Sequence, residues 1–174
     1  MDIQGEKKSE TSVFKKYWIN LLLEDHRIGN EGIFEFVIVD APDWVMIVPR
    51  TTDGKYLLVQ QYRPAWQELS LEFPAGRLIE GEEFEQGAAR ELTEETGYAA
   101  NSFELLTEAR PISWSRQRMA IYQAENLIYK GQDLDDEEAI EVIAASSEEI
   151  REFIRTGKMY QMASILAYNL ICNQ

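Results

Sequence analysis

The sequence predicts one α/β domain, and three features of the chain indicate this fold class. Runs of β-branched and aromatic residues come first, a helix rich in Glu and Ala stands near the middle, and further strands precede helices at the end. A length of 174 residues suits one compact domain with a substantial core. We therefore expect residues 13–174 to form a single domain, and the polar residues 1–12 to form a flexible N-terminus.

The expected strands follow the apolar runs in chain order. They cover residues 14–23, 33–39, 43–49, 56–63, 71–73, 103–109, 118–124 and 140–144. Asp53-Gly54 is a hairpin-turn signal, because glycine tolerates a positive φ. The expected helices cover 83–95, closed by Gly97; 146–157, opened by the capping box of Ser146 and Glu149; and 159–171.

Charge and composition exclude several function classes. The net charge of −14 argues against nucleic acid as a partner, because an acidic surface repels phosphates. The single Cys172 cannot form an intrachain disulfide, and the single His26, which we place in a surface turn without a role, excludes a site with two imidazoles. No apolar run approaches the roughly 18 residues of a membrane span, and no signal core opens the chain. We expect a cytoplasmic protein that does not bind membranes.

The expected central helix carries an unusual excess of acid. Seven glutamates and one basic residue, Arg90, lie between Glu80 and Glu95. At roughly 100° per residue, Glu91, Glu94 and Glu95 share one side of the helix, where a pair about 5 Å apart repels by roughly 3 kcal/mol. The helix dipole also disfavours anions in this C-terminal half. A hard cation such as Mg²⁺ or Mn²⁺, bound by these carboxylates, would offset the repulsion. The alternative interpretation is an acidic helix that faces solvent and binds no metal.

A specific spacing runs through this helix. Gly76 is followed by five residues and Glu82, and then by seven residues and the run Arg90-Glu91-Leu92-Thr93-Glu94-Glu95-Thr96-Gly97-Tyr98. The pattern resembles the Nudix box, G-x5-E-x7-R-E-U-x-E-E-x-G-U, in which U is a bulky apolar residue and Tyr98 is a slight loosening. The resemblance implies an α/β/α sandwich with a mixed β-sheet, in which a loop–helix–loop holds Mg²⁺ against a diphosphate.

Three segments outside the box resemble the branch of ADP-ribose and nucleoside-diphosphate-sugar pyrophosphatases. They are Gln61-Tyr62-Arg63, residues 71–76, and residues 138–142. The resemblance implies Mg²⁺-dependent hydrolysis of the diphosphate linkage of ADP-ribose or a related nucleotide sugar, which gives a nucleoside monophosphate and a sugar phosphate. It also implies a homodimer with exchanged N-terminal strands.

The resemblance assigns the residues of the box to metal binding and to its support. The implied metal ligands are Glu91, Glu95 and the carbonyl of Ala75, with Glu94 close by. The implied supports of the ligating helix are Arg90 and Glu82, and Gly76 allows the tight entry into it.

The remaining assignments concern the substrate. The resemblance places Arg63 against the diphosphate and Glu72 against the substrate or the partner subunit. It assigns the general base to Glu138, and the adjacent Glu137 stays open as an alternative. Trp18 and Phe34 would stack on the nucleotide base, although ordinary strand packing explains them equally well.

One segment departs from the branch pattern and leaves the substrate open. Residues 109–115 lack the glycine of an expected Pro-Gly turn, and Gln117 replaces a nearby acid, which weakens strict ADP-ribose specificity. Nucleoside triphosphate hydrolysis stays an alternative; isopentenyl diphosphate isomerisation is disfavoured because no cysteine lies near the box. A non-catalytic nucleotide-sugar sensor is a further alternative, against which the intact Glu91, Glu94 and Glu95 argue. The sequence does not determine the base, the sugar, the number of metal ions or the oligomeric state.

Overall fold

The computed structural model describes residues 4–134 and 139–173, which form two compact units. The first unit contains the chain up to Asp43 together with Arg110–Arg118. The second unit contains Trp44–Ala109 and the chain from Met119 onward. Residues 13–174, which the sequence predicts to form one domain, contribute to both units.

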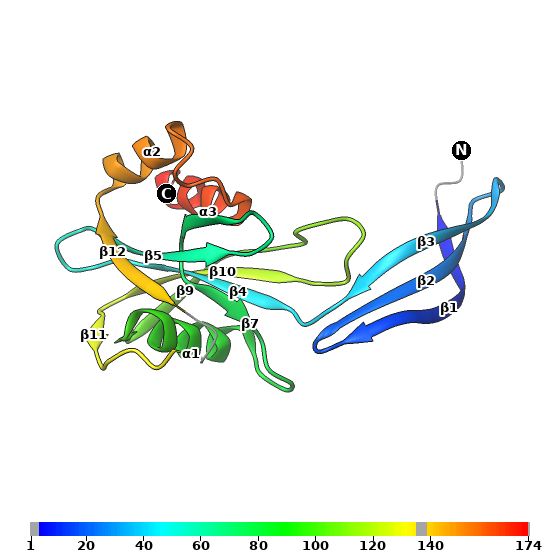
Figure 1. The fold of residues 1–174 in the computed structure, drawn as a ribbon, viewed down its shortest axis with the longest axis horizontal. Helices are drawn as coiled ribbons and strands as arrows, with labels where there is room; N and C mark the ends of the chain where they lie inside the picture. The colour runs from blue at the N-terminus through cyan, green and yellow to red at the C-terminus, as the bar shows by residue number, and fades with distance from the viewer. Residues whose placement is uncertain (1–3, 135–138, 174) are drawn as a thin grey trace. The chain divides into compact units, whose positions relative to one another are not determined.

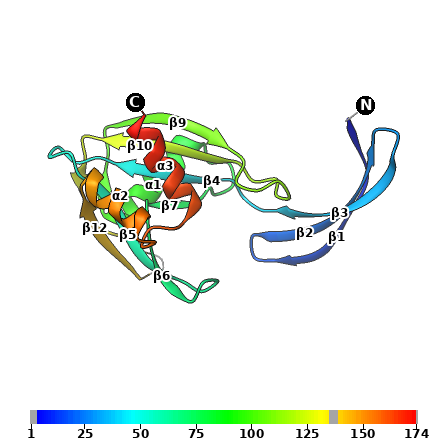
Figure 2. The ribbon, with the colours of Figure 1, turned by 90° about the horizontal axis from the view of Figure 1, so that it is seen from above.

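The first unit is built on an antiparallel sheet in the order β1-β2-β3 (Figure 2). Its strands are β1 (Gly5–Lys16), β2 (Ile19–Ile28) and β3 (Gly32–Asp40). Strand β1 therefore includes most of the segment expected to be flexible, because its backbone pairs along the length of β2. The expected strand 14–23 is wrong: Tyr17, with φ of 53°, and Trp18 form a turn that divides it.

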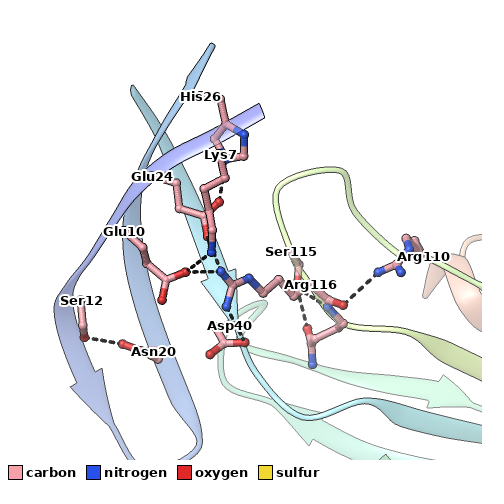
Figure 3. Close-up of polar contacts among 11 residues, drawn as sticks. Lys7, Glu10, Ser12, Asn20, Glu24, His26, Asp40, Arg110, Ser115 and Arg116 are labelled. Carbon is pink, nitrogen blue, oxygen red and sulfur yellow. Dashed lines mark hydrogen bonds and ion pairs between the residues drawn. The ribbon is translucent and has the colours of Figure 1, made fainter. Parts of the chain in front are cut away.

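A charge cluster joins the loop of residues 110–118 to this sheet. Arg116 forms ion pairs with Glu10 on β1, Glu24 on β2 and Asp40 on β3 (Figure 3). Glu24 is nearly fully buried, and it also contacts Nε2 of His26 at 2.7 Å. His26 therefore lies in a strand, not in the surface turn that the sequence suggested, because the acidic and basic residues around it are strand partners.

The second unit contains the other strands and all the helices that the structure describes. A mixed sheet has the order β7-β4-β10-β9, in which β10 runs parallel to β4 and antiparallel to β9. An antiparallel sheet has the order β12-β5-β6, and a short pair joins β11 to β8. The strands are β4 (Trp44–Pro49), β5 (Tyr56–Arg63), β6 (Glu68–Glu72), β7 (Ala75–Arg77), β8 (Tyr98–Ala99), β9 (Ser102–Ala109), β10 (Met119–Glu125), β11 (Ile128–Tyr129) and β12 (Ile140–Ala145).

The helices cover opposite faces of these strands (Figure 1). They are α1 (Phe84–Thr96), α2 (Ser147–Arg155) and α3 (Met162–Cys172). Successive residues of β4 point to opposite faces, so Val45 and Ile47 pack with α1, whereas Met46 and Val48 pack with α2 and α3. The predicted α/β/α sandwich with a mixed sheet is confirmed.

The helix ends follow the predicted signals closely. Ser146 and Glu149 form the expected capping box of α2, and Gly97 ends α1 with φ of 77°. The last helix begins at Met162, three residues later than expected. Within the described part of the chain, no helix is both long and apolar enough to span a membrane.

Candidate active site

Strand β7 precedes α1 in the chain, and its backbone lies against the acidic side of that helix. Gly76 pairs with Val45 of β4. Strand β7 ends at Arg77, and Gln86, nine residues later, lies in the first turn of α1. A Cβ built on Gly76 would lie 1.9 Å from Oε1 of Glu91. Only a residue without a side chain allows this approach, so the first glycine of the box brings the β7 backbone to a carboxylate.

Arg90 is the hub of the polar contacts on α1. Its Nε and Nη2 donate to the two carboxylate oxygens of Glu82, both at 2.9 Å. Its Nη1 donates to Glu91 Oε1 at 2.7 Å and to Glu94 Oε2 at 2.8 Å. Nη2 also donates to the carbonyl of Arg77 at 2.8 Å, which ties the helix to the end of β7. One guanidinium therefore holds three carboxylates of the box in a fixed arrangement.

These contacts change the ionisation of the two supporting residues. The hydrogen bonds from the Arg90 guanidinium are the largest cause that lowers the pKa of Glu82 below its usual value. The same bonds raise the pKa of Arg90, above all through Glu82 and further through Glu91 and Glu94. Glu82 also accepts from the backbone N–H of Ile79 at 3.0 Å, so it is fixed as a carboxylate between the helix and the loop that precedes it.

Glu95 lies on the same side of the helix and faces β7. It is 2% exposed, and its Oε2 accepts from the backbone N–H of Ala75 at 3.0 Å. Glu91 is 8% exposed. The two carboxylates that the resemblance assigns as metal ligands are thus buried and lie against the Ala75–Gly76 backbone.

The carboxylates of Glu91 and Glu95 and the carbonyl of Ala75 suit a hard divalent cation, although their oxygens do not converge on one point in this structure. Carboxylate and backbone carbonyl oxygens are the ligands that Mg²⁺ and Mn²⁺ prefer. Within residues 4–134 and 139–173, no three acidic, histidine or cysteine side chains already converge in a metal-ligating arrangement. Arg90 instead forms ion pairs with Glu91 and Glu94.

A second ion pair lies on the hairpin of β5 and β6. Arg63 donates from Nε to Glu72 Oε1 at 2.8 Å and from Nη2 to Glu72 Oε2 at 2.6 Å, in a bidentate pair. The Glu72 side chain is 0% exposed, whereas that of Arg63 is 34% exposed. Glu72 therefore faces Arg63 inside the protein, and the arginine is the member of the pair that reaches solvent.

The other site residues that the sequence singled out belong to the first unit or to the part of the chain that the structure does not describe. Trp18 lies in the β1–β2 turn and Phe34 lies on β3, both in the first unit and both nearly half exposed. Packing inside the first unit therefore does not bury either ring. Glu138, the residue assigned as general base, and its neighbour Glu137 lie outside the described residues.

Sequence reasoning missed the backbone contributions to this site. The carbonyl of Arg77 and the N–H of Ile79 bind Arg90 and Glu82 through groups that every residue carries. The fixed spacing from Gly76 to Glu82 is the signal that could have located them, because it sets the length of the loop that returns to the helix. Residue identity alone gives no such signal.

Comparison with known proteins places these residues in a family. A model of the NUDIX domain matches residues 41–164, which include every residue of the box. The chain is 29% identical over 163 residues to the ADP-ribose pyrophosphatase of Bacillus subtilis (strain 168), in an alignment that covers 91% of this chain and 88% of that protein. It is also 29% identical over 166 residues to the methanol dehydrogenase activator of Bacillus methanolicus, covering 93% and 90% of the two proteins.

A solved structure shows the same fold. The crystal structure of an ADP compounds hydrolase superposes with a TM-score of 0.86 and covers 98% of this chain and 93% of its own. Its sequence identity of 21% makes this a likeness of fold.

Proposed function

Because the chain belongs to the Nudix family of hydrolases, we propose that it hydrolyses the diphosphate linkage of ADP-ribose or a related nucleoside diphosphate sugar. The products would be a nucleoside monophosphate and a sugar phosphate. The observation that carries this proposal is the group of Glu91, Glu94 and Glu95 at the end of α1. Arg90 binds the first two carboxylates and the carbonyl of Arg77, and the backbone N–H of Ala75 on β7 binds the third. Three acidic side chains crowded at one helix end suit the capture of a cation and, through it, of an anionic diphosphate.

The residues of the box would hold a divalent ion, Mg²⁺ or Mn²⁺. Glu91, Glu95 and the carbonyl of Ala75 would be its ligands, Glu94 would lie close by, and Gly76 would keep the β7 backbone near enough. When bound there, the ion supplies charge neutralisation and Lewis acidity for the diphosphate and lowers the pKa of water. Arg90 and Glu82 would fix the ligands, because their bonds determine where the carboxylates of α1 can point.

Arg63 would bind the diphosphate from the β5–β6 hairpin. Its guanidinium is partly exposed and is held in one plane by two hydrogen bonds to Glu72. A planar cation fixed in this way is suited to a phosphate oxygen and to the charge that develops on it. We assign Glu72, which is buried, to orienting Arg63 rather than to direct contact with the substrate.

The proton of the attacking water would go to a carboxylate in the segment between β11 and β12. Glu138 is our choice for this general base and Glu137 is the alternative. A Glu138→Gln variant tests the choice: strongly reduced turnover supports it, and near-normal turnover moves the role to Glu137 or to hydroxide.

We propose that the first unit contributes to binding of the nucleotide base and to dimer formation. Trp18 and Phe34 expose aromatic surface that could stack on a base, and we propose that role for them. We also propose a homodimer in which the N-terminal strands are exchanged; sedimentation of the purified chain tests it. We propose no nucleic acid partner, since the net charge is −14.

Related proteins support a nucleoside diphosphate sugar as the substrate class. The B. subtilis relative, aligned over most of both chains, is an ADP-ribose pyrophosphatase, and a mouse ADP-sugar pyrophosphatase is 45% identical over 60 residues, 34% of this chain. Several sugars fit this class, and Gln117 gives no reason to favour ADP-ribose alone.

A substrate panel tests the proposal. The purified chain is incubated with ADP-ribose, other nucleoside diphosphate sugars and nucleoside triphosphates, with and without Mg²⁺ or Mn²⁺, and the products are separated by chromatography. We expect metal-dependent release of nucleoside monophosphate and sugar phosphate. Pyrophosphate release from triphosphates would favour the other hydrolase activity, and binding without turnover would indicate a nucleotide-sugar sensor.

A further inference from the structure

The segment of residues 129–133 closes over the C-terminal end of α1, where Glu94 and Glu95 lie. Tyr129 pairs with Tyr98 in the β8–β11 ladder, and their rings meet edge to face with centroids 5.1 Å apart. This places the segment against the last turn of the helix. We call residues 129–133 the clasp.

The clasp donates hydrogen bonds to the carbonyls that end the helix. The backbone N–H groups of Lys130 and Gly131 donate to the carbonyl of Gly97 at 2.6 and 3.1 Å. The N–H of Asp133 donates to the carbonyl of Glu94 at 3.2 Å. The side-chain Nε2 of Gln132 donates to the carbonyl of Glu95 at 2.6 Å. The last carbonyls of a helix lack partners within it, so these donors satisfy groups that the helix leaves open.

Glu95 is consequently held from both directions. Gln132 of the clasp donates a hydrogen bond to the backbone carbonyl of Glu95, and the N–H of Ala75 on β7 donates one to its carboxylate. The last turn of α1 contains no basic side chain that could serve the same carbonyls. The donors of the clasp also oppose the negative end of the helix dipole, which otherwise disfavours the two glutamates.

The final glycine of the box is what allows the clasp to approach. Gly97 has φ of 77°, and a Cβ built on it would lie 2.8 Å from the ring of Tyr129 and 2.9 Å from the backbone nitrogen of Gln132. Any side chain at this position would press the clasp away from the helix. Gly76 and Gly97 therefore play similar roles. Gly76 lets the backbone of β7 approach the acidic end of α1, and Gly97 lets the backbone of the clasp do so.

We propose that Gln132 is a positioning residue for the metal-binding carboxylates of α1, acting through the backbone of Glu95. This inference rests on the proposed function, because it takes those carboxylates as metal ligands. Loss of the Gln132 bond removes one constraint on the backbone of Glu95 and lets the last turn of the helix shift relative to β7. Supporting residues around metal ligands typically change metal affinity by 10- to 100-fold when they are removed.

The test compares Mn²⁺ binding to the full chain and to a Gln132→Met variant, measured by titration with electron paramagnetic resonance detection well below the melting temperature. Methionine keeps the length of the side chain and removes its N–H donor. The matched control is Asn169→Leu, which removes a hydrogen bond of 2.8 Å from the side-chain Nδ2 of Asn169 to the carbonyl of Ile165 on α3. We expect Gln132→Met to weaken Mn²⁺ binding about 10-fold and to raise the Mg²⁺ concentration for half-maximal activity similarly. The Asn169 variant should match the wild type in both measurements.

The outcomes separate this inference from the proposed function. Unchanged Mn²⁺ affinity and metal activation in Gln132→Met overturn the inference while the proposed function stands. A wild-type chain that binds no Mn²⁺ overturns both.

A second measurement needs only the wild type and decides the matter if the variant does not fold. If the clasp positions the metal ligands, bound metal must in turn stabilise the clasp, because coupling between two sites is reciprocal. Mn²⁺ should therefore slow hydrogen exchange at the amides of Lys130, Gly131 and Asp133, and leave that of Ile150 in α2 unchanged. Equal exchange of the clasp amides with and without Mn²⁺ overturns the inference.

Discussion

Gly76 lies so close to Glu91 that a single methyl group on the glycine would come within 1.9 Å of the glutamate carboxylate. The two residues belong to a strand and a helix that a loop separates, so this approach joins two elements at the centre of the candidate site. It explains why the box begins with glycine: a side chain at position 76 would occupy the place of the Glu91 carboxylate.

Gly76→Ala should strongly reduce activity while leaving the fold intact. The new methyl group displaces a side-chain carboxylate rather than backbone, so the protein can relax by moving Glu91, and we expect a change in unfolding free energy of about 1 kcal/mol or less. Turnover should fall by about 100-fold or more, because a proposed ligand is moved. Steady-state kinetics and urea unfolding measure the two effects. The control is Gly54→Ala, where φ is 82° and the surroundings are open: it should lose about 1 kcal/mol and keep its turnover. Normal turnover in Gly76→Ala would contradict the assignment of Glu91.

Glu95→Gln should separate catalysis from stability. The amide oxygen of glutamine can still accept from the N–H of Ala75, and one negative charge leaves a crowded acidic group, so stability should be unchanged or slightly higher. The rate constant kcat should fall by about 100- to 1000-fold, since one charged ligand is lost. Glu85→Gln makes the same change of charge at an exposed position in the first turn of the helix and should have normal kinetics. Retained activity in Glu95→Gln would reject the metal assignment.

Arg63 and Glu72 should act as one unit in a double-mutant cycle. Arg63→Ala should raise KM for the nucleotide sugar by about 10-fold or more, and Glu72→Gln should raise it less, because the guanidinium keeps one acceptor but loses its fixed plane. If Glu72 acts through Arg63, its substitution should add nothing to KM in the Arg63→Ala background. Independent, additive effects on KM would instead indicate that Glu72 contacts the substrate itself. Melting temperatures of the three variants control for the loss of a buried charge partner.

The residues of the box were predictable because their spacing encodes both the elements and the contacts between them. The distance of eight residues from Glu82 to Arg90 spans the helix entry, and the structure closes it with two hydrogen bonds of 2.9 Å. The match of the NUDIX domain model to residues 41–164 confirms the family that this spacing identified. Helical periodicity also placed Glu91 and Glu95 on one side of α1, where both are buried.

Other features depend on contacts between segments and give little local signal. Tyr17 and Trp18 are typical strand residues, and no glycine, proline or asparagine stands beside the turn that they form. The predicted strand 14–23 therefore joined the end of β1 to the start of β2. The burial of Glu72 follows from the register of the β5–β6 hairpin, which brings Arg63 within reach. The clasp is a product of the fold, since Gln132 and Glu95 are 37 residues apart. Such pairings appear only when the strands are in place.

Glu82 should make the free energy of unfolding depend on pH in the acidic range. Arg90 lowers the pKa of Glu82 in the folded protein below the ordinary value of 4.5. The stabilisation from the charged pair is therefore fully present above pH 4.5, and it is lost as the pH falls through the lower pKa of the folded state. Glu82→Gln should reduce the free energy of unfolding by about 2 kcal/mol at pH 7, and this difference from the wild type should shrink steadily below pH 4.5. Urea unfolding at pH 7, 5, 4 and 3 measures it. In an Arg90→Met background, the substitution of Glu82 should no longer produce the same dependence on pH, because the cation that lowers the pKa is gone. A difference that stays constant from pH 7 to pH 3 would show that Glu82 stabilises the protein through its shape and not through its charge.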